Sequence, residues 1–400
     1  MPGLVPFDEA CERIFSLIAP LEALALATTS ADQHVVVSDI CARRTSPSDA
    51  LSAMDGYAVR ADDVKPGSPL AVVAHITPGT KAHKQTLETG QCARIFTNAT
   101  MPLGADSVLI QENTSQAQSE NHVYPTTRVT PGTYVRPRGL DFVKNDILVS
   151  AGTPLSPATI ALLISGGISS VKVHRHPRVS IISTGDELID PTEWTPEQNH
   201  CVPASNAPML QSLLARHGYQ SALLPIDKDD LAALQAQLES LINSSDFVIS
   251  TGGASVGEYD IVRQFLTQNA NDIHIEKIAM RPGKPVMLAR LGQLWWLALP
   301  GNPVSSFVTG LVFGIGICHR LAGNQTPWPL YQQGTLAGDL PANDERLEFM
   351  RAMNTKSKLT PFDRQDSSML RALALANALL VRPAYAPPAR SGETVRFLSL

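Results

Sequence analysis

Two short stretches of the sequence place glycine and carboxylate side chains directly after apolar runs. The run "RVSII" leads into "STGDELID" at residues 183–190, and "DFVI" leads into "STGGASVGEYD" at residues 250–260. Such runs are typical of buried strands, and glycine after each permits a tight turn. A turn alone does not need the acids that follow, which are Asp186, Glu187, Glu258 and Asp260. Because open α/β sheets bind ligands beyond the carboxyl ends of their strands, both stretches are candidate binding turns.

Crowded carboxylates repel one another unless a cation neutralises them, so Glu187, Asp186 and Asp260 indicate a hard metal ion. Oxygen ligands suit Mg²⁺, which commonly joins protein carboxylates to a phosphate of the substrate. Asp227 follows the apolar run "SALLPI" and would lie at the same edge of the sheet. As an alternative, Asp227 could be the N-cap of the next helix.

Three small residues of the second turn, Gly252, Gly253 and Ser255, would let backbone N–H groups approach an anion at the start of the following helix. The stretch is neither a GxGxxG fingerprint nor a P-loop. The glycines could simply form a tight turn, but two acids within seven residues and a second glycine-acid turn favour a binding site.

Cations and prolines follow further along the chain. "EKIAMRPGKPVML" holds Lys277, Arg281 and Lys284, which could be a solvated sheet edge but, beside an anion-binding turn, would hold phosphate or oxyanion groups. In "LPGNPVSSF", Pro300 and Pro303 fix the backbone where a helix begins. We expect the N–H groups of Val304 and Ser305 to be free there.

Upstream, polar loops place Asp55 in "SAMDGYAV" and Thr97 in "RIFTNATMPLGAD", and "VRPRGLDF" adds Arg136, Arg138 and Asp141. Taken singly, each could be a turn former.

The elements that must position these residues follow from periodicity. Apolar spacing predicts an amphipathic helix over residues 8–18 with Asp8 as its N-cap, short strands over 70–137, and a helix over 157–164 between a proline and two glycines. From residue 177, β-branched runs alternate with amphipathic helices, which predicts a parallel, doubly wound sheet. After residue 324, four strand-like runs predict a small β module.

Composition narrows the class of protein. The chain has 400 residues, 44% of them hydrophobic and 17% charged, with a net charge of −5 and a pI near 6.1. This argues against a generic nucleic-acid or membrane-surface binder. Five scattered cysteines without a CxxC pair favour a reducing compartment. The N-terminus lacks the pattern of a signal peptide, and the apolar run at 307–318 is too short to span a bilayer, so we expect a cytoplasmic protein.

Eight motifs occur in order: SAMDGYAV, RIFTNATMPLGAD, RPRGLDF, STGDEL, SNAPML, TGGASVGEYD, RPGKP and LPGNPVS. This series resembles the molybdopterin molybdenumtransferase family, which includes bacterial MoeA and the E domain of gephyrin. The resemblance implies a multidomain fold of α/β and β parts, in which a doubly wound, molybdopterin-binding domain joins a β-rich inserted module and a small C-terminal β-barrel-like domain. The implied boundaries are residues 1–50 with 138–176 for an N-terminal linker and dimerisation domain, 51–137 for the inserted module, 177–323 for the α/β domain and 324–400 for the C-terminal domain.

The resemblance also implies a function. Such proteins are homodimers that insert molybdate into the dithiolene of adenylylated molybdopterin with the help of Mg²⁺, and release AMP. Carried over by motif, the catalytic residues would be Asp55 and Thr97, from the partner subunit, with Glu187, Asp227 and Asp260, the last three also being the metal ligands. The substrate-binding residues would be Gly252, Gly253, Ser255, Lys277, Arg281, Lys284, Pro300 and Pro303. Other proteins of molybdenum cofactor biosynthesis are the expected partners.

Three positions depart from the family pattern. Arg281 replaces the usual Lys, Asn98 replaces the Gly that commonly follows the Thr of the FTGA-type motif, and "CVPASN" lacks the usual acidic or amide residue before SN. Two alternatives share the fold: a non-catalytic scaffold and a molybdopterin adenylyltransferase.

Overall fold

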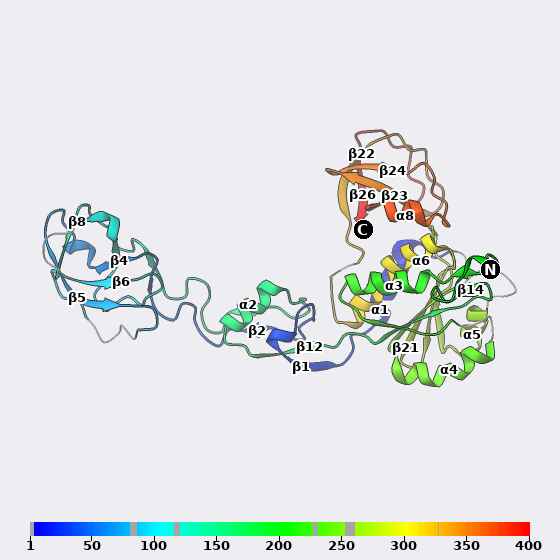
Figure 1. The fold of residues 1–400 in the computed structure, drawn as a ribbon, viewed down its shortest axis with the longest axis horizontal. Helices are drawn as coiled ribbons and strands as arrows, with labels where there is room; N and C mark the ends of the chain where they lie inside the picture. Colours follow the sequence, from blue (N-terminus) through cyan, green and yellow to red (C-terminus); the bar gives the residue numbers. More distant parts are fainter. Residues whose placement is uncertain (1–3, 81–85, 116–120, 227–230, 253–260, 327) are drawn as a thin grey trace.

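The computed structural model describes residues 1–400 except 1–3, 81–85, 116–120, 227–230, 253–260 and 327. The molecule is elongated, with a β-rich module at one end and an α/β sheet with a second β module at the other (Figure 1). A slender middle part joins the two ends. It contains the antiparallel pair β1 (Ala23–Ala27) and β12 (Ser170–His174) and the helix α2 (Pro157–Ser165). The predicted helix at 157–164 is confirmed, and Ser156 caps it by accepting from the Thr159 N–H.

The α/β part is built on a six-stranded sheet with the order β16-β13-β17-β21-β20-β18. Four adjacent strands run parallel, and β20 and β18 extend the sheet in antiparallel fashion. The strands are β13 (Val179–Ser183), β16 (Ser221–Leu223), β17 (Phe247–Thr251), β18 (Asp272–Ile275), β20 (Met287–Leu291) and β21 (Leu294–Leu299).

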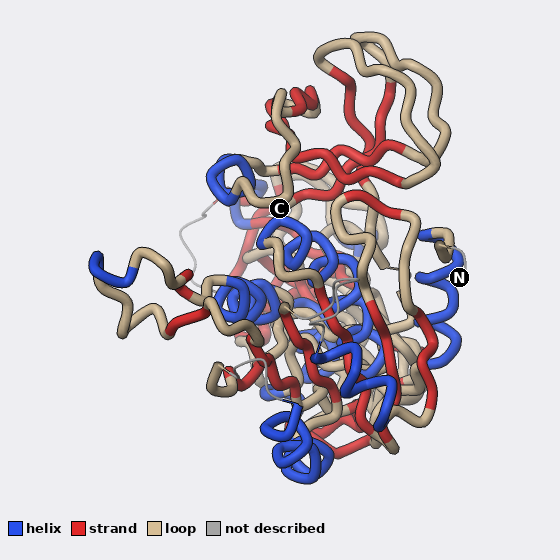
Figure 2. The backbone as a smooth tube through the Cα atoms, turned by 90° about the vertical axis from the view of Figure 1, so that its right-hand side faces the viewer, coloured by secondary structure: helices blue, strands red, loops and turns tan. Residues whose placement is uncertain are grey.

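Helices cover both faces of this sheet, which confirms the predicted doubly wound architecture (Figure 2). Successive residues of a strand point to opposite faces, so Ile181 packs in one core and Ile182 in the other. One core includes residues of α1 (Phe7–Leu17), α3 (Asn206–Arg216), α6 (Pro303–Thr309) and α7 (Ile315–Leu321), and the other residues of α4 (Leu231–Ser244) and α5 (Ile261–Asn269). The expected Asp8 cap is wrong, because α1 begins at Phe7, with Pro6 in the N-cap position and no side-chain cap bond.

A five-residue π-helical segment, Gly310–Gly314, joins α6 to α7, so the apolar helix is longer than the run seen in the sequence. By length and composition, Pro303–Leu321 could cross a membrane, but 78% of its apolar window is buried inside the protein. This helix therefore packs as a core element of the α/β part.

The β-rich module contains a six-stranded sheet with the order β7-β4-β6-β5-β9-β8. The runs "LAVVAHI", "CARI" and "SVLI" form strands as predicted. The strands are β4 (Gly56–Val59), β5 (Leu70–Ile76), β6 (Gln91–Ile95), β7 (Ser107–Ile110), β8 (Thr114–Ser115) and β9 (His122–Pro125). Two-residue pairs link it to the middle part: β3 (Leu51–Ser52) with β10 (Val135–Arg136), and β2 (Ile40–Cys41) with β11 (Ile147–Val149).

In the C-terminal module, five strands close into a barrel through the pairings β23-β24-β22-β26-β25-β23. The predicted small β-barrel-like domain is thereby confirmed. The strands are β22 (Gln332–Leu336), β23 (Leu347–Thr355), β24 (Lys358–Pro361), β25 (Ala378–Arg382) and β26 (Thr394–Ser399), and α8 (Leu370–Leu375) lies between β24 and β25. From the α/β part, β19 (Met280–Arg281) pairs in parallel with β23.

Candidate active site

The two glycine-acid turns lie side by side at one edge of the α/β sheet. Ser183 at the end of β13 pairs with Thr251 at the end of β17, and Thr251 pairs with Leu299 at the end of β21. In the sheet, β16 lies on one side of β13, and β17, the next strand along the chain, lies on the other side of β13. This reversal is a topological switch point, the place where open α/β sheets form a crevice for ligands.

The turns approach one another closely. The Thr184 N–H donates to the Thr251 carbonyl oxygen at 3.1 Å. Gly252 has a φ of +96°, and a Cβ added there would lie only 2.2 Å from the Thr184 carbonyl oxygen. A Cβ at Gly301 would lie 3.6 Å from the Gly252 Cα. Glycine at position 252 is therefore required by both backbone angle and space.

A cavity of about 330 Å³ opens over these strand ends. Two of the wall residues, Glu187 and Pro303, are site residues predicted from the sequence. Thr251 and Gly301 also lie in the wall and belong to the turns after β17 and β21. The β14 (Leu188–Ile189) and β15 (Val202–Pro203) pair forms one side. The full lining is Ser183, Glu187, Leu188, Val202, Pro203, Ala204, Ser205, Asn206, Thr251, Gly301, Pro303, Ser368 and Leu370.

The C-terminal module closes part of this cavity. The Val304 N–H donates to the Ser367 carbonyl oxygen at 3.0 Å, and Asn302 Nδ2 donates to Ser367 Oγ at 2.9 Å. The expected free N–H of Val304 is therefore wrong, because a distant loop satisfies it. Ser368 and Leu370 in the wall were not predicted as site residues. Their string "SSML" was visible in the sequence, but nothing local indicated that it would reach the "LPGNPVS" turn.

Of the acids that the sequence assigns to a metal, the structure describes Glu187 and Asp186, and Glu187 lines the cavity, whereas Asp186 is exposed and is not in its wall. The Glu187 carboxylate lies over Gly185, where an added Cβ would be 2.8 Å from Oε2. Asp227, Gly253, Ser255, Glu258 and Asp260 lie outside the described residues. Within the described ranges, no group of three or more His, Cys, Asp or Glu side chains has the arrangement of a metal site. The three-carboxylate site stays a prediction.

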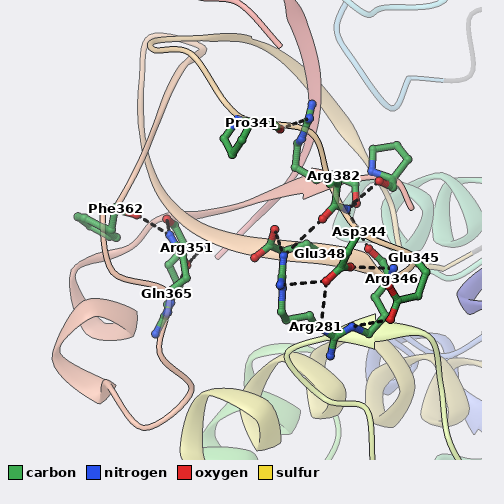
Figure 3. A network of polar contacts seen from close by, with 12 residues as sticks. Arg281, Pro341, Asp344, Glu345, Arg346, Glu348, Arg351, Phe362, Gln365 and Arg382 are labelled. Carbon is green, nitrogen blue, oxygen red and sulfur yellow. Dashed lines mark hydrogen bonds and ion pairs between the residues drawn. The ribbon is translucent and has the colours of Figure 1, made fainter. Parts of the chain in front are cut away.

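The predicted cationic residues lie beside the C-terminal module. Arg281 Nη1 is 3.2 Å from Asp344 Oδ2, and Arg281 Nη2 is 2.8 Å from Glu348 Oε2 (Figure 3). The hydrogen bond that Arg281 donates to Glu348 is the main reason that the pKa of Arg281 is raised. Lys277 is half-buried and Lys284 is exposed, and these three cations are not among the described residues that line the cavity. Their contact with an oxyanion stays a prediction.

The structure brings Asp55 and Thr97 together at the β-rich end of the molecule, and their catalytic role stays a prediction. Thr97 donates its backbone N–H and its hydroxyl to Asp55 Oδ1, each at 2.8 Å. These two bonds hold the pKa of the Asp55 carboxyl below its ordinary value, the backbone bond being the larger cause. Asp55 therefore stays ionised and keeps a second oxygen for other partners.

Asn98 follows Thr97 with a φ of +65°, in the left-handed region. Among residues other than glycine, Asn adopts the left-handed region most readily. This accounts for Asn98 at a position where the family pattern usually has Gly. Its Oδ1 accepts from Arg136 Nη1 at 2.6 Å, so the replacement adds a contact to the loop.

Comparisons with known proteins agree with the order of these parts. Family models match residues 5–167 (MoeA N-terminal region, domain I and II), 180–317 (probable molybdopterin binding domain) and 333–400 (MoeA C-terminal region, domain IV). A molybdopterin molybdenumtransferase of Nostoc sp. is 38% identical over 363 residues, which are 87% of this chain and 82% of the relative. A protein of the same name from Bacillus subtilis is 31% identical over 405 residues, covering 98% of this chain and 94% of the relative.

Among solved structures, the molybdopterin biosynthesis MoeA protein from Pyrococcus horikoshii OT3 has a TM-score of 0.83 and 25% identity, with 100% of both chains covered. This similarity extends over all modules of the fold. Together with the sequence relatives, it shows that the chain belongs to the molybdopterin molybdenumtransferase family.

Proposed function

We propose that this protein inserts molybdate into the dithiolene of adenylylated molybdopterin and releases AMP, giving molybdenum cofactor. One observation carries the proposal: the cavity at the switch point combines the Glu187 carboxylate with the turns of Thr251 and Gly301. An anionic nucleotide-linked substrate suits such a strand-end crevice, because backbone N–H groups and small residues let phosphate groups approach closely.

Mg²⁺ is the proposed metal. Among the described wall residues, Glu187 offers a carboxylate, a hard oxygen ligand of the kind that Mg²⁺ prefers. Asp227 and Asp260 are the further ligands that we propose from the sequence. Bound Mg²⁺ would neutralise negative charge on the substrate phosphates.

The residues of the chain hold and orient the substrate. Gly252 keeps the β17 turn tight against Thr184, and Pro303 begins α6 in the cavity wall. Gly253 and Ser255 are proposed to bind phosphate, with Lys277, Arg281 and Lys284 supplying positive charge and Pro300 shaping the turn. Such positioning lowers the entropic cost of bringing molybdate to the dithiolene.

We propose that the working unit is a homodimer. In one chain, the β-rich module with Asp55 and Thr97 lies at the opposite end of the elongated molecule from the cavity (Figure 1). If these residues act on the substrate, a second chain has to bring them to the cavity. A cytoplasmic location and transfer of the product to other proteins of molybdenum cofactor biosynthesis complete the proposal.

The test incubates the purified protein with adenylylated molybdopterin and molybdate, with and without Mg²⁺, and measures AMP. We expect AMP release that requires both molybdate and Mg²⁺ and that is lost in Glu187→Gln. A parallel incubation with free molybdopterin and ATP detects an adenylyltransferase. AMP release that does not depend on molybdate contradicts the proposal. If the protein turns over neither adenylylated molybdopterin with molybdate nor molybdopterin with ATP, it acts as a scaffold.

A further inference from the structure

A chain of polar side chains begins in the cavity wall and connects the turns around the cavity. Asn206, the first residue of α3, donates from Nδ2 to the Gly301 carbonyl oxygen at 2.7 Å and to Thr251 Oγ1 at 2.9 Å. Thr251 Oγ1 is 3.0 Å from Ser306 Oγ, which donates to the Pro300 carbonyl oxygen at 2.7 Å. Asn206 was not among the residues predicted to act in the site.

The direction of every bond in this chain is determined. A carbonyl oxygen can only accept, so the single hydroxyl proton of Ser306 goes to Pro300, and both protons of the Asn206 amide are used. Thr251 must then donate to Ser306. Since Thr251 and Ser306 are 2% and 0% exposed, water cannot replace a lost partner at either hydroxyl.

The two carbonyl oxygens that receive these bonds belong to consecutive residues of the turn after β21. Because both carbonyl groups are hydrogen-bonded, the orientation of the Pro300–Gly301 backbone is restricted, and with it the way in which Gly301 lines the cavity. The same amide holds Thr251, directly before Gly252, whose φ is +96°. One side chain therefore sets the geometry of two neighbouring turns.

We infer that Asn206 is a positioning residue for substrate binding, and that Thr251 and Ser306 relay its effect to the Pro300–Gly301 turn. The inference rests on the proposed function for the identity of the substrate, an adenylylated pterin. With both amide protons committed, the Asn206 side chain has only acceptor capacity left, so a ligand group that contacts it is a hydrogen-bond donor, such as a hydroxyl or an amine.

The experiment compares wild-type protein with Asn206→Asp and Asn206→Ala. Asparagine and aspartate have nearly the same shape, and the carboxylate keeps acceptor capacity but cannot donate to Gly301. We expect both variants to raise the KM for adenylylated molybdopterin about tenfold, the effect of losing one or two hydrogen bonds that hold the turns, with a smaller change in kcat. Asn269→Asp is the matched control, because Asn269 Nδ2 also donates to a backbone carbonyl oxygen, that of Phe265, at 2.9 Å, within α5.

A second pair of variants tests the relay without changing Asn206. Thr251→Val removes the hydroxyl and should raise KM as Asn206→Asp does, whereas Thr251→Ser keeps the hydroxyl and should restore wild-type behaviour. Hydrogen exchange of residues 300–306 in the ligand-free protein is the readout that does not depend on activity. We expect faster exchange there in Asn206→Asp and Thr251→Val, and not in Thr251→Ser or Asn269→Asp.

The outcomes separate this inference from the proposed function. If the wild-type protein releases no AMP but exchange of residues 300–306 rises in Asn206→Asp, the proposed function fails and the positioning role stands. If AMP is released normally and Asn206→Asp has wild-type KM and wild-type exchange, the positioning role is overturned. A variant that does not fold is replaced by the Thr251 pair, whose serine member retains every bond.

Discussion

Thr97 gives the Asp55 carboxylate a double hydrogen bond through its backbone N–H and its hydroxyl. Thr97→Val removes only the hydroxyl, so the pKa of Asp55 should rise but remain below its ordinary value, because the larger cause, the backbone bond, persists. Carboxyl ¹³C NMR titration measures this directly. Since the pKa is depressed in the folded state, any stability from these bonds is present above the unfolded pKa of about 3.9 and is lost as pH falls through the folded pKa.

Thr97→Ser is the control for this titration, because serine keeps a hydroxyl at the same place. An Asp55 pKa that is unchanged in Thr97→Val would mean that the hydroxyl bond contributes nothing to ionising the carboxylate.

At the scale of elements, the turn after β17 depends on the absence of a side chain at Gly252. Gly252→Ala places a Cβ 2.2 Å from the Thr184 carbonyl oxygen at a φ of +96°. We expect a loss of more than about 1 kcal/mol in the free energy of unfolding, since backbone strain of this kind costs about 1–3 kcal/mol, and a loss of AMP release. Chemical denaturation and the AMP assay measure the two effects.

Gly292→Ala separates the effect of positive φ from the effect of the close approach to Thr184. Gly292 also has positive φ, +62°, in the turn between β20 and β21, but nothing lies within 4 Å of an added Cβ. If Gly252→Ala and Gly292→Ala lower the free energy of unfolding by the same amount, the close approach of Gly252 to Thr184 contributes nothing beyond the effect of positive φ.

The ends of β13, β17 and β21 could be predicted because each apolar run stops at a glycine or proline, and parallel strands end at one edge. The contacts made across the fold could not. Val304 pairs with Ser367, 63 residues later, and Asn206 reaches Gly301, 95 residues later. Such pairings depend on how modules dock, which leaves no local periodicity in the sequence.

A cluster of aromatic and histidine rings lies where the middle part meets α3 and α7. Tyr219 Oη is 2.8 Å from His319 Nδ1, and His176 stacks on His34 with ring centroids 4.0 Å apart. Burial lowers the pKa of His319 to about 4, helped by the charges that His217 and His176 would carry, and burial also lowers the pKa of His176 and His217. The neighbouring groups of the same junction are Arg216, Cys318, Arg320 and Trp328.

These shifts predict how stability depends on pH. Between the folded pKa of about 4 and an unfolded pKa of about 6.5, the unfolded state binds more protons, so the free energy of unfolding should fall as pH falls through this range. His319→Gln should flatten that slope, whereas His75→Gln, on the exposed side of β5, should not. Urea denaturation at several pH values between 7 and 5 measures the slope, and an equal slope in wild type and His319→Gln would contradict the prediction.

At the scale of the whole molecule, Arg281 joins the α/β part to the C-terminal module through Asp344 and Glu348 (Figure 3). Arg281→Ala should lower the free energy of unfolding by about 1 kcal/mol or less, because 41% of the arginine side chain is exposed and water screens the pairs. Arg281→Lys should lose less, since it keeps one charge. Thermal unfolding measures both variants.

Substrate binding by the same variants tests the oxyanion role predicted from the sequence. A loss of affinity of about tenfold or more in Arg281→Ala would mean that the guanidinium also holds the substrate. Unchanged affinity with reduced stability would restrict Arg281 to joining the two modules.

The separation of Asp55 from the cavity along the molecule makes the proposed dimer testable by complementation. If the site is shared as proposed, Asp55→Ala and Glu187→Gln each inactivate one half of it, so each variant alone should release little AMP. When the two variants are mixed and exchange subunits, one of the two cavities in a mixed dimer combines an intact Asp55 with an intact Glu187. Random exchange makes half of the dimers mixed, so about one quarter of all cavities are intact, and we expect about a quarter of wild-type AMP release. Differently tagged chains verify that the subunits have exchanged. If AMP release does not recover after verified exchange, the shared site is contradicted. A wild-type protein that is monomeric and fully active would contradict it as well.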